Sequence, residues 1–68
     1  MRTFKSGDRV KLNQAFLSDF EEQLQGATQE ELQGTVQGYS EDEKLIVVFD
    51  WEGATEAIEA YYFEPLDQ

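Results

Sequence analysis

The chain has 68 residues and a formal net charge of −10, from 15 acidic and 5 basic residues, and it contains neither cysteine nor histidine. This length suffices for one small domain, and the lack of cysteine excludes disulfide bonds, thiolate metal sites and thiol redox chemistry. The lack of histidine removes the commonest general base and the commonest metal ligand.

The acidic charge is concentrated after residue 11. Four of the five basic residues lie before that point, at Arg2, Lys5, Arg9 and Lys11. Residues 12–68 carry 14 carboxylates against Lys44 alone, a net charge of −13. Such a surface repels nucleic-acid phosphates and attracts basic proteins, so we expect no direct nucleic-acid binding. The alternative is that the acidity serves solubility alone.

The N-terminal segment predicts a cytoplasmic protein whose structure begins with a turn and a strand. No apolar stretch is long enough for a signal peptide or a membrane span. Residues 6–8 are typical of a turn. Residues 9–12 predict a half-buried strand, because Val10 and Leu12 alternate with basic residues and point inward.

The next segment predicts a helical insertion over residues 13–33. Asn13 can cap a helix, and Gly26 suits a helix C-terminus, so we predict an amphipathic helix over residues 14–25. Its apolar side chains recur at a spacing of four, at Phe16, Phe20 and Leu24. We expect Phe20 to be buried in the core. Thr28 and Glu31 have the spacing of a capping box, which predicts a second helical turn to about Leu32, with an ordered loop as the alternative.

The second half of the chain predicts four further strands. Residues 34–39, flanked by glycines, indicate a bent strand, and residues 40–44 a hairpin connection. Residues 45–51 form the longest apolar run and predict the central strand, because β-branched and aromatic residues favour a pleated backbone. A weaker strand over 55–60, a tight turn at 61–63 and a short edge strand over 64–66 follow.

The central strand raises a packing question at Ile46 and Val48. If Leu45, Val47, Phe49 and Trp51 face the interior, then Ile46 and Val48 point outward and need a cover. The cover could be the apolar side of the inserted helix, a second copy of the chain in a weak homodimer, or a partner subunit. We favour the helix, because its apolar stripe also needs a surface to pack on.

This order of strands resembles the SH3-like small barrels, a group that includes KOW modules, Tudor domains and photosystem I reaction-centre subunit IV. The resemblance rests on Gly7-Asp8-Arg9-Val10-Lys11-Leu12, Gly34-Thr35-Val36, Val47-Val48-Phe49-Asp50 and Phe63-Glu64-Pro65-Leu66. It implies a mainly β fold: one domain over 1–68, a five-stranded SH3-like barrel with the helical insertion in its first long loop. Members of this group mostly bind proteins or nucleic acids and rarely catalyse reactions.

Aromatic residues near predicted strand ends are the best candidates for partner contacts. In Tudor-type barrels such aromatics form a cage for methylated lysine or arginine, and a carboxylate reinforces the cation–π attraction. The alternative is that these rings mainly fill the core. The candidate partner-binding residues are Tyr39, Asp42, Asp50, Trp51, Glu52, Tyr61 and Tyr62.

The sequence therefore predicts a non-catalytic, acidic protein-interaction module or accessory subunit that binds a basic protein surface. One alternative is a nucleic-acid mimic that inhibits a DNA- or RNA-handling enzyme, and a weaker one is a Tudor-like reader of modified lysine or arginine. No catalytic residue, cofactor or metal site is predicted. The acidic run 41–43 lacks the spacing and glycine of a calcium loop, and no phosphate-binding glycine loop is present.

Overall fold

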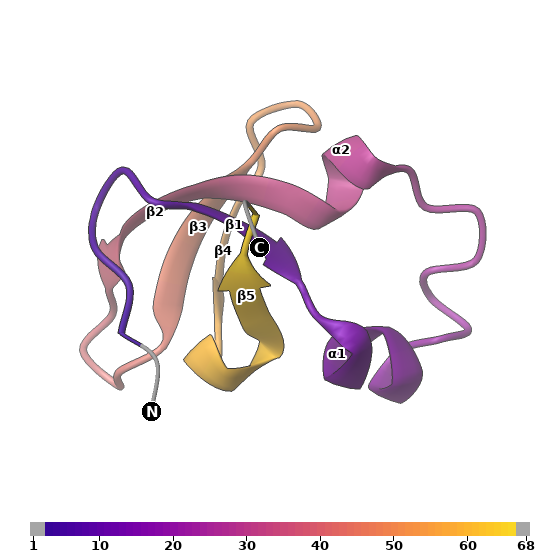
Figure 1. Ribbon diagram of the computed structural model, residues 1–68, viewed down its shortest axis with the longest axis horizontal. Helices are drawn as coiled ribbons and strands as arrows, with labels where there is room; N and C mark the ends of the chain where they lie inside the picture. The colour runs from indigo at the N-terminus through magenta and orange to yellow at the C-terminus, as the bar shows by residue number, and fades with distance from the viewer. Residues whose placement is uncertain (1–2, 67–68) are drawn as a thin grey trace.

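The computed structural model describes residues 3–66 and shows a mainly β protein with a five-stranded antiparallel sheet and two short helices (Figure 1). The strands are β1 (Arg9–Leu12), β2 (Gln33–Tyr39), β3 (Leu45–Phe49), β4 (Thr55–Ile58) and β5 (Phe63–Pro65). The helices are α1 (Gln14–Asp19) and α2 (Gln29–Leu32), and a 3-10 helix, η1 (Ala60–Tyr62), precedes β5. None of these helices is long and apolar enough to cross a membrane.

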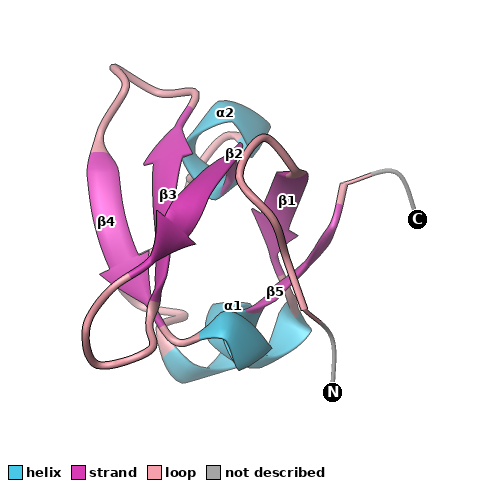
Figure 2. Ribbon diagram, turned by 90° about the vertical axis from the view of Figure 1, so that its left-hand side faces the viewer, coloured by secondary structure: helices cyan, strands magenta, loops and turns pink. Residues whose placement is uncertain are grey.

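The sheet has the order β4-β3-β2-β1-β5, so β3, β2 and β1 lie inside it and β4 and β5 form its two edges. It curls so that β4 lies on one side of the molecule and β1 and β5 on the other (Figure 2). Pro65 lies opposite Val10 in the edge strand β5, where its missing N–H can face away from the ladder. All five predicted strands are present. Among residues 3–66, no ladder joins β4 to β5.

The hydrophobic core lies on the concave side of the sheet. Val10 and Leu12 of β1 point into it, as the alternation predicts, and so do alternate residues of the central strand. The buried hydrophobic side chains of residues 3–66 are Phe4, Val10, Leu12, Val36, Leu45, Val47, Phe49 and Phe63. Phe4 belongs to no predicted element. It is held in place because the N-terminal arm pairs with β2, where the Gly7 N–H donates to the Val36 carbonyl at 2.8 Å.

Two positions explain the shape of β2. A Cβ at Gly34 would lie 2.5 Å from the Val48 carbonyl oxygen and 2.9 Å from the Phe49 Cα, so only glycine lets β2 and β3 approach this closely. Between Val36 and Gly38 the register with β3 shifts, and Gly38 has a φ of +157°. The bend predicted from the flanking glycines is this irregularity.

The central strand is shorter than predicted and ends at Phe49 rather than Trp51. Glu52 and Gly53 both have positive φ angles, 56° and 65°, and the Ala54 N–H donates to the Trp51 carbonyl at 3.2 Å. Positive φ at both central positions and this hydrogen bond fit a type I′ turn, which lies within the four-residue loop 50–53. The turn takes Trp51 out of the strand, so its side chain lies at the surface rather than in the interior.

The insertion contains the predicted helix only in part. α1 ends at Asp19 rather than Gln25, and the chain continues as turns to Gly26. Asp19, Glu21 and Glu22 lie where a longer helix would have its later turns, with no basic residue in the last turn of α1. Carboxylates there oppose the helix dipole, which accounts for the early end. The predicted capping box is confirmed in α2, where the Thr28 N–H donates to Glu31 Oε1 at 3.1 Å.

The aromatic side of the insertion packs on η1 rather than on Ile46 and Val48. The Phe16 ring lies 4.5 Å from the Phe20 ring and 5.1 Å from the Tyr62 ring, centroid to centroid. Phe20 is 38% exposed and lies outside the buried core, contrary to the prediction. The outward side chains of β3 remain partly exposed, each beside a small or polar neighbour on the adjacent strands.

Candidate functional site

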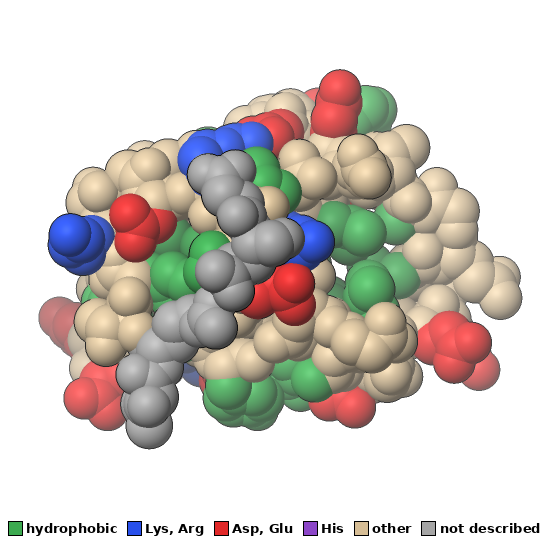
Figure 3. Space-filling model, viewed as in Figure 1, with side chains coloured by type: hydrophobic (Ala, Val, Ile, Leu, Met, Phe, Trp, Pro, Cys, Tyr) green, Lys and Arg blue, Asp and Glu red, His purple; other side chains and the backbone are tan. Residues whose placement is uncertain are grey.

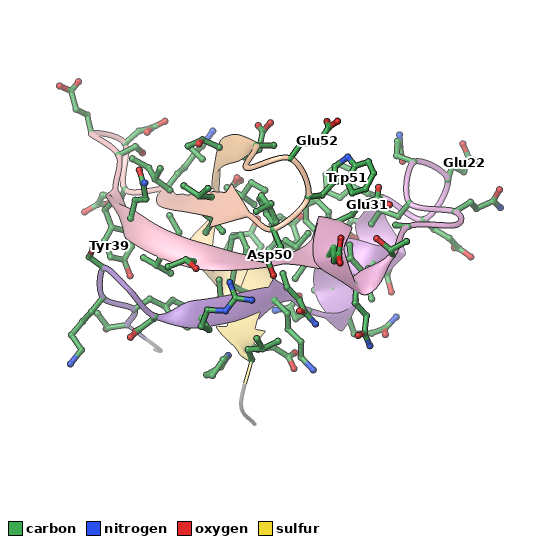
Figure 4. The ribbon with its side chains drawn as sticks, turned by 90° about the horizontal axis from the view of Figure 1, so that it is seen from above. Glu22, Glu31, Tyr39, Asp50, Trp51 and Glu52 are labelled. Atoms are coloured by element: carbon green, nitrogen blue, oxygen red, sulfur yellow. The ribbon has the colours of Figure 1, made fainter. Side chains whose placement is uncertain are left out.

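The structure distributes the seven candidate partner-binding residues over three places. Tyr39 and Asp42 lie at the β2–β3 end of the sheet, and Asp50, Trp51 and Glu52 lie at the opposite end of β3. Tyr61 and Tyr62 belong to η1. Figure 4 shows Tyr39 far from Trp51, so these two rings do not line one common space. The seven candidates therefore do not form one joint aromatic cage.

The polar groups at the β2–β3 end have partners within the chain. The Tyr39 hydroxyl accepts a hydrogen bond from the Phe4 N–H at 3.2 Å, which ties the N-terminal arm to β2. The Ser40 hydroxyl donates to Asp42 Oδ1 and, together with nearby Lys44, lowers the pKa of this carboxyl below its ordinary value. Lys44 Nζ lies 3.9 Å from Asp42 Oδ2. These contacts stabilise the turn.

The tyrosines of η1 hold the insertion against the sheet. The Tyr62 hydroxyl donates to Asp19 Oδ2 at 2.7 Å, and this hydrogen bond is the largest cause of the raised pKa of Tyr62. A hydrogen bond with Tyr61 raises this pKa further. The two tyrosine rings lie 4.4 Å apart, centroid to centroid. Asn13 completes the junction, because its side chain caps α1 at the Phe16 N–H and donates to the Tyr61 carbonyl at 2.7 Å. Tyr62 thus has a structural role.

Asp50 is paired with one of the few basic residues. Arg9 Nη1 and Nη2 lie 2.8 and 2.7 Å from the two Asp50 carboxylate oxygens, a bidentate geometry that joins β1 to the β3–β4 turn. Arg9 Nη1 also donates to Thr35 Oγ1 at 3.0 Å. The hydrogen bond from Arg9 holds the pKa of Asp50 below its ordinary value. The Asp50 carboxylate is therefore already neutralised, and it is not the group that a basic partner would meet first.

Trp51 has a different environment. Its side chain is 48% exposed, although its backbone N–H is fixed by a hydrogen bond to the Glu30 carbonyl at 3.1 Å. This bond seats the first turn of α2 against the β3–β4 turn, and Figure 1 shows the two segments side by side. Figure 4 shows Glu31 next to Trp51 and Glu52 on the same turn. We call Glu30, Glu31, Trp51 and Glu52 the Trp51 patch.

The Trp51 patch combines an exposed π surface with three exposed carboxylates. All four of its residues are exposed, and the backbone beneath them is fixed from both sides, since the Asp50 N–H also donates to the Gln33 carbonyl at 2.9 Å. A tryptophan face attracts cations, and neighbouring carboxylates strengthen that attraction. The chemistry of the patch suits a lysine or arginine side chain.

The sequence points to Trp51 and Glu52 but not to their neighbours in α2. Glu30 and Glu31 are about twenty residues away along the chain, and nothing in the spacing of the residues places α2 beside the β3–β4 turn. The capping box could have located Glu31 at a helix start, but not the surface on which that helix packs. The link is the backbone bond from Trp51 to Glu30, which depends on the tertiary fold.

The described residues also form a pocket on another part of the surface. A pocket of about 370 Å³ lies between β1, the two helices and β5, and Figure 3 shows a hollow with hydrophobic side chains inside it. Its two charged residues, Lys11 and Glu64, face each other across 3.7 Å, and the rest of its lining is aliphatic or amide-bearing. Among residues 3–66, no group of three or more acidic side chains could hold a metal ion.

No protein-family model, curated protein or solved structure matches this chain.

Proposed function

We propose that this chain is a non-catalytic interaction module, built on an SH3-like barrel, that binds a basic segment of a partner protein at the Trp51 patch. The observation that supports this most directly is the half-exposed indole on a rigid backbone beside three exposed carboxylates. Exposed tryptophan is costly to leave in water, and a site of this kind gains most when a cation covers the ring.

The backbone at Glu52 supports the same conclusion. This residue has a φ of 56°, a conformation that asparagine or glycine adopts at lower cost in a type I′ turn. Glu43, in the β2–β3 turn, has a similar φ of 65°. At position 52 the chain retains a carboxylate beside Trp51 despite that cost. A glutamate at this position places its carboxylate beside Trp51, as the proposed binding role requires.

The distribution of carboxylates favours this proposal over a nucleic-acid mimic. A mimic needs carboxylates spaced like phosphates along one stripe. On the face that Figure 3 shows, the acidic side chains lie apart, separated by polar and hydrophobic surface. One of the chain's carboxylates, that of Asp50, is paired with Arg9. The patch around Trp51 is a local feature, which suits a short basic segment.

The chain offers a direct test, because Trp51 is its only tryptophan and its fluorescence reports on the patch alone. The probe is an acetylated and amidated peptide of sequence GRGRG, with an otherwise identical peptide carrying citrulline in place of arginine as the neutral control. We expect a saturable change in Trp51 emission with the arginine peptide that weakens as salt is raised, and none with the citrulline peptide.

Variants locate the binding. Glu31→Gln preserves the capping box, since glutamine also serves at that position, and removes one charge of the patch. Glu41→Gln removes the same charge from an exposed turn at the opposite end of β3. Glu31→Gln should weaken binding of the GRGRG peptide about threefold or more, and Glu41→Gln should leave it within error. Equal effects of the two variants, or equal binding of the citrulline peptide, would contradict the proposal.

A further inference from the structure

The strand that follows the Trp51 patch, β4, has a free side. It is an edge strand, and among residues 3–66 its only strand neighbour is β3. The Phe49 N–H donates to the Ala54 carbonyl at 2.8 Å, so Phe49 and Ala54 are a hydrogen-bonded pair at the end of the β3–β4 ladder. In an antiparallel pair the bonded positions recur every second residue, so Glu56 bonds to Val47. The N–H and carbonyl groups of Thr55 and Ala57 then point away from β3, toward the free side.

The side chains of β4 leave this edge accessible. Thr55, Glu56 and Ala57 are all exposed. Thr55 lies opposite Val48 and Ala57 opposite Ile46, so on this face two small side chains stand between the free edge and the partly exposed apolar residues of β3. Glu56 lies on the other face, opposite the buried Val47, yet its carboxylate remains exposed at the margin of the core.

We propose that an extended basic segment of the partner adds to β4 as a sixth, antiparallel strand. This deepens the proposed function and rests on it for the basic character of the partner. Strand addition of this kind takes its affinity from backbone hydrogen bonds and its specificity from alternate side chains. The partner residue opposite Glu56 is basic, and its two neighbours, opposite Thr55 and Ala57, are β-branched or apolar and extend the surface of Ile46 and Val48.

Charge selects this occupant over a second copy of the chain. In the antiparallel register that places Thr55 of one copy opposite Ala57 of the other, the two Glu56 side chains lie directly opposite each other. Like charges at opposite positions are destabilising, and each copy also brings a net charge of −10. A basic strand places an opposite charge at the same position. β4 follows directly after the β3–β4 turn, so one end of a strand added to β4 lies near Trp51 and Glu52.

The test uses the whole protein and an acetylated, amidated heptapeptide of sequence TVRVRVT, with binding measured by calorimetry. If an arginine faces Glu56, the flanking valine amides face the free groups of Thr55 and Ala57, and the arginine amides point away. Methylation of the central valine's backbone nitrogen, which flanks both arginines, should therefore lower affinity about tenfold or more, and methylation of the first arginine's backbone nitrogen less than about twofold. The two methylated peptides have the same composition and charge, so each controls for the other.

Variants of the protein give a second readout. Ala57→Pro removes an N–H on the free side of β4 and leaves the hydrogen bonds between β3 and β4 intact. It should therefore abolish TVRVRVT binding, while the far-ultraviolet circular dichroism spectrum is retained. Glu56→Gln should weaken binding more than the matched Glu41→Gln. If Ala57→Pro fails to fold, the two methylated peptides still decide the question on the unaltered protein.

The outcomes separate this inference from the proposed function. If both methylated peptides bind equally well and the GRGRG peptide still changes Trp51 emission, strand addition is wrong and the Trp51 patch stands. If the methylation pattern holds but no arginine peptide changes Trp51 emission, the edge is the site and the patch is not. If no peptide binds, both are wrong. Concentration-dependent dimerisation without peptide, lost in Ala57→Pro, would assign the edge to a second copy and overturn the inference.

Discussion

Individual residues in the β3–β4 turn show a conflict between stability and the proposed binding role. Glu52 occupies a left-handed backbone conformation directly before Gly53, which has the same sign of φ. The turn type accounts for the glycine, because a type I′ turn needs positive φ at both central positions. It does not account for the glutamate. Trp51, which precedes it, is likewise left half-exposed at the surface.

Replacing Glu52 by asparagine is expected to stabilise the protein and to weaken binding of the GRGRG peptide. Asparagine tolerates the left-handed conformation, so the free energy of unfolding should rise by about 0.5 to 1 kcal/mol in urea melts. Glu52→Gln is the matched control: it removes the same charge, but glutamine has no such backbone preference. The control should weaken binding to a similar degree without the gain in stability. A loss of stability in Glu52→Asn would mean that the carboxylate has a structural role.

At the level of elements, the sequence predicts what local chemistry determines. The alternation of Val10 and Leu12, the β-branched run of β3 and the capping box of α2 each depend on a few adjacent residues, and each is present as expected. The central strand and the inserted helix were both predicted too long. In each case an adjacent feature ends the element, the type I′ turn after Phe49 and the carboxylates after Asp19.

Contacts between distant elements do not follow from the sequence, and the predicted packing of the inserted helix on Ile46 and Val48 is wrong. The apolar stripe of Phe16 and Phe20 indicates that the insertion packs on something, but its spacing does not say on what. The actual surface, η1, contains Tyr61 and Tyr62, which sequence analysis assigns to a turn and to partner binding. The approach of α2 to Trp51 was missed for the same reason. Both contacts join segments that lie more than twenty residues apart along the chain.

The aromatic contact between α1 and η1 should contribute unequally through its two phenylalanines. Phe16 is partly buried and packs against the buried core, whereas Phe20 is 38% exposed and contacts the rings of Phe16 and Tyr62. We expect Phe16→Ala to lower the free energy of unfolding by about 3 kcal/mol and Phe20→Ala by about 1 kcal/mol, in chemical denaturation. Equal losses would mean that the insertion docks through Phe20 as much as through Phe16.

At the scale of the whole molecule, the charge balance governs how stability depends on pH. Fourteen carboxylates and one lysine share residues 12–68. Their mutual repulsion is stronger in the folded chain than in the expanded one, so between pH 7 and about 5 the folded state takes up protons more readily. By linkage, the state that binds more protons gains stability as the pH falls, so the melting temperature should rise over this range. Added salt at pH 7 should raise it as well, by screening the repulsion.

Asp42 and Asp50 reverse this trend at lower pH. Hydrogen bonds from Ser40 and Arg9 respectively hold the pKa of each below the ordinary value of 3.8. A carboxyl group with a lowered folded-state pKa gives stability that is present above its ordinary pKa and is lost as the pH falls through the folded value. The melting temperature should therefore pass through a maximum between about pH 5 and 4 and decline below it. Asp50→Asn should flatten the decline, since it removes the bidentate pair with Arg9.

Thermal melts from pH 7 to 2, in low and moderate salt, measure both the expected rise of the melting temperature and its expected decline at lower pH. A melting temperature that falls steadily from pH 7 would mean that internal pairs already compensate the acidic surface, and the electrostatic case for a basic partner would fail with it.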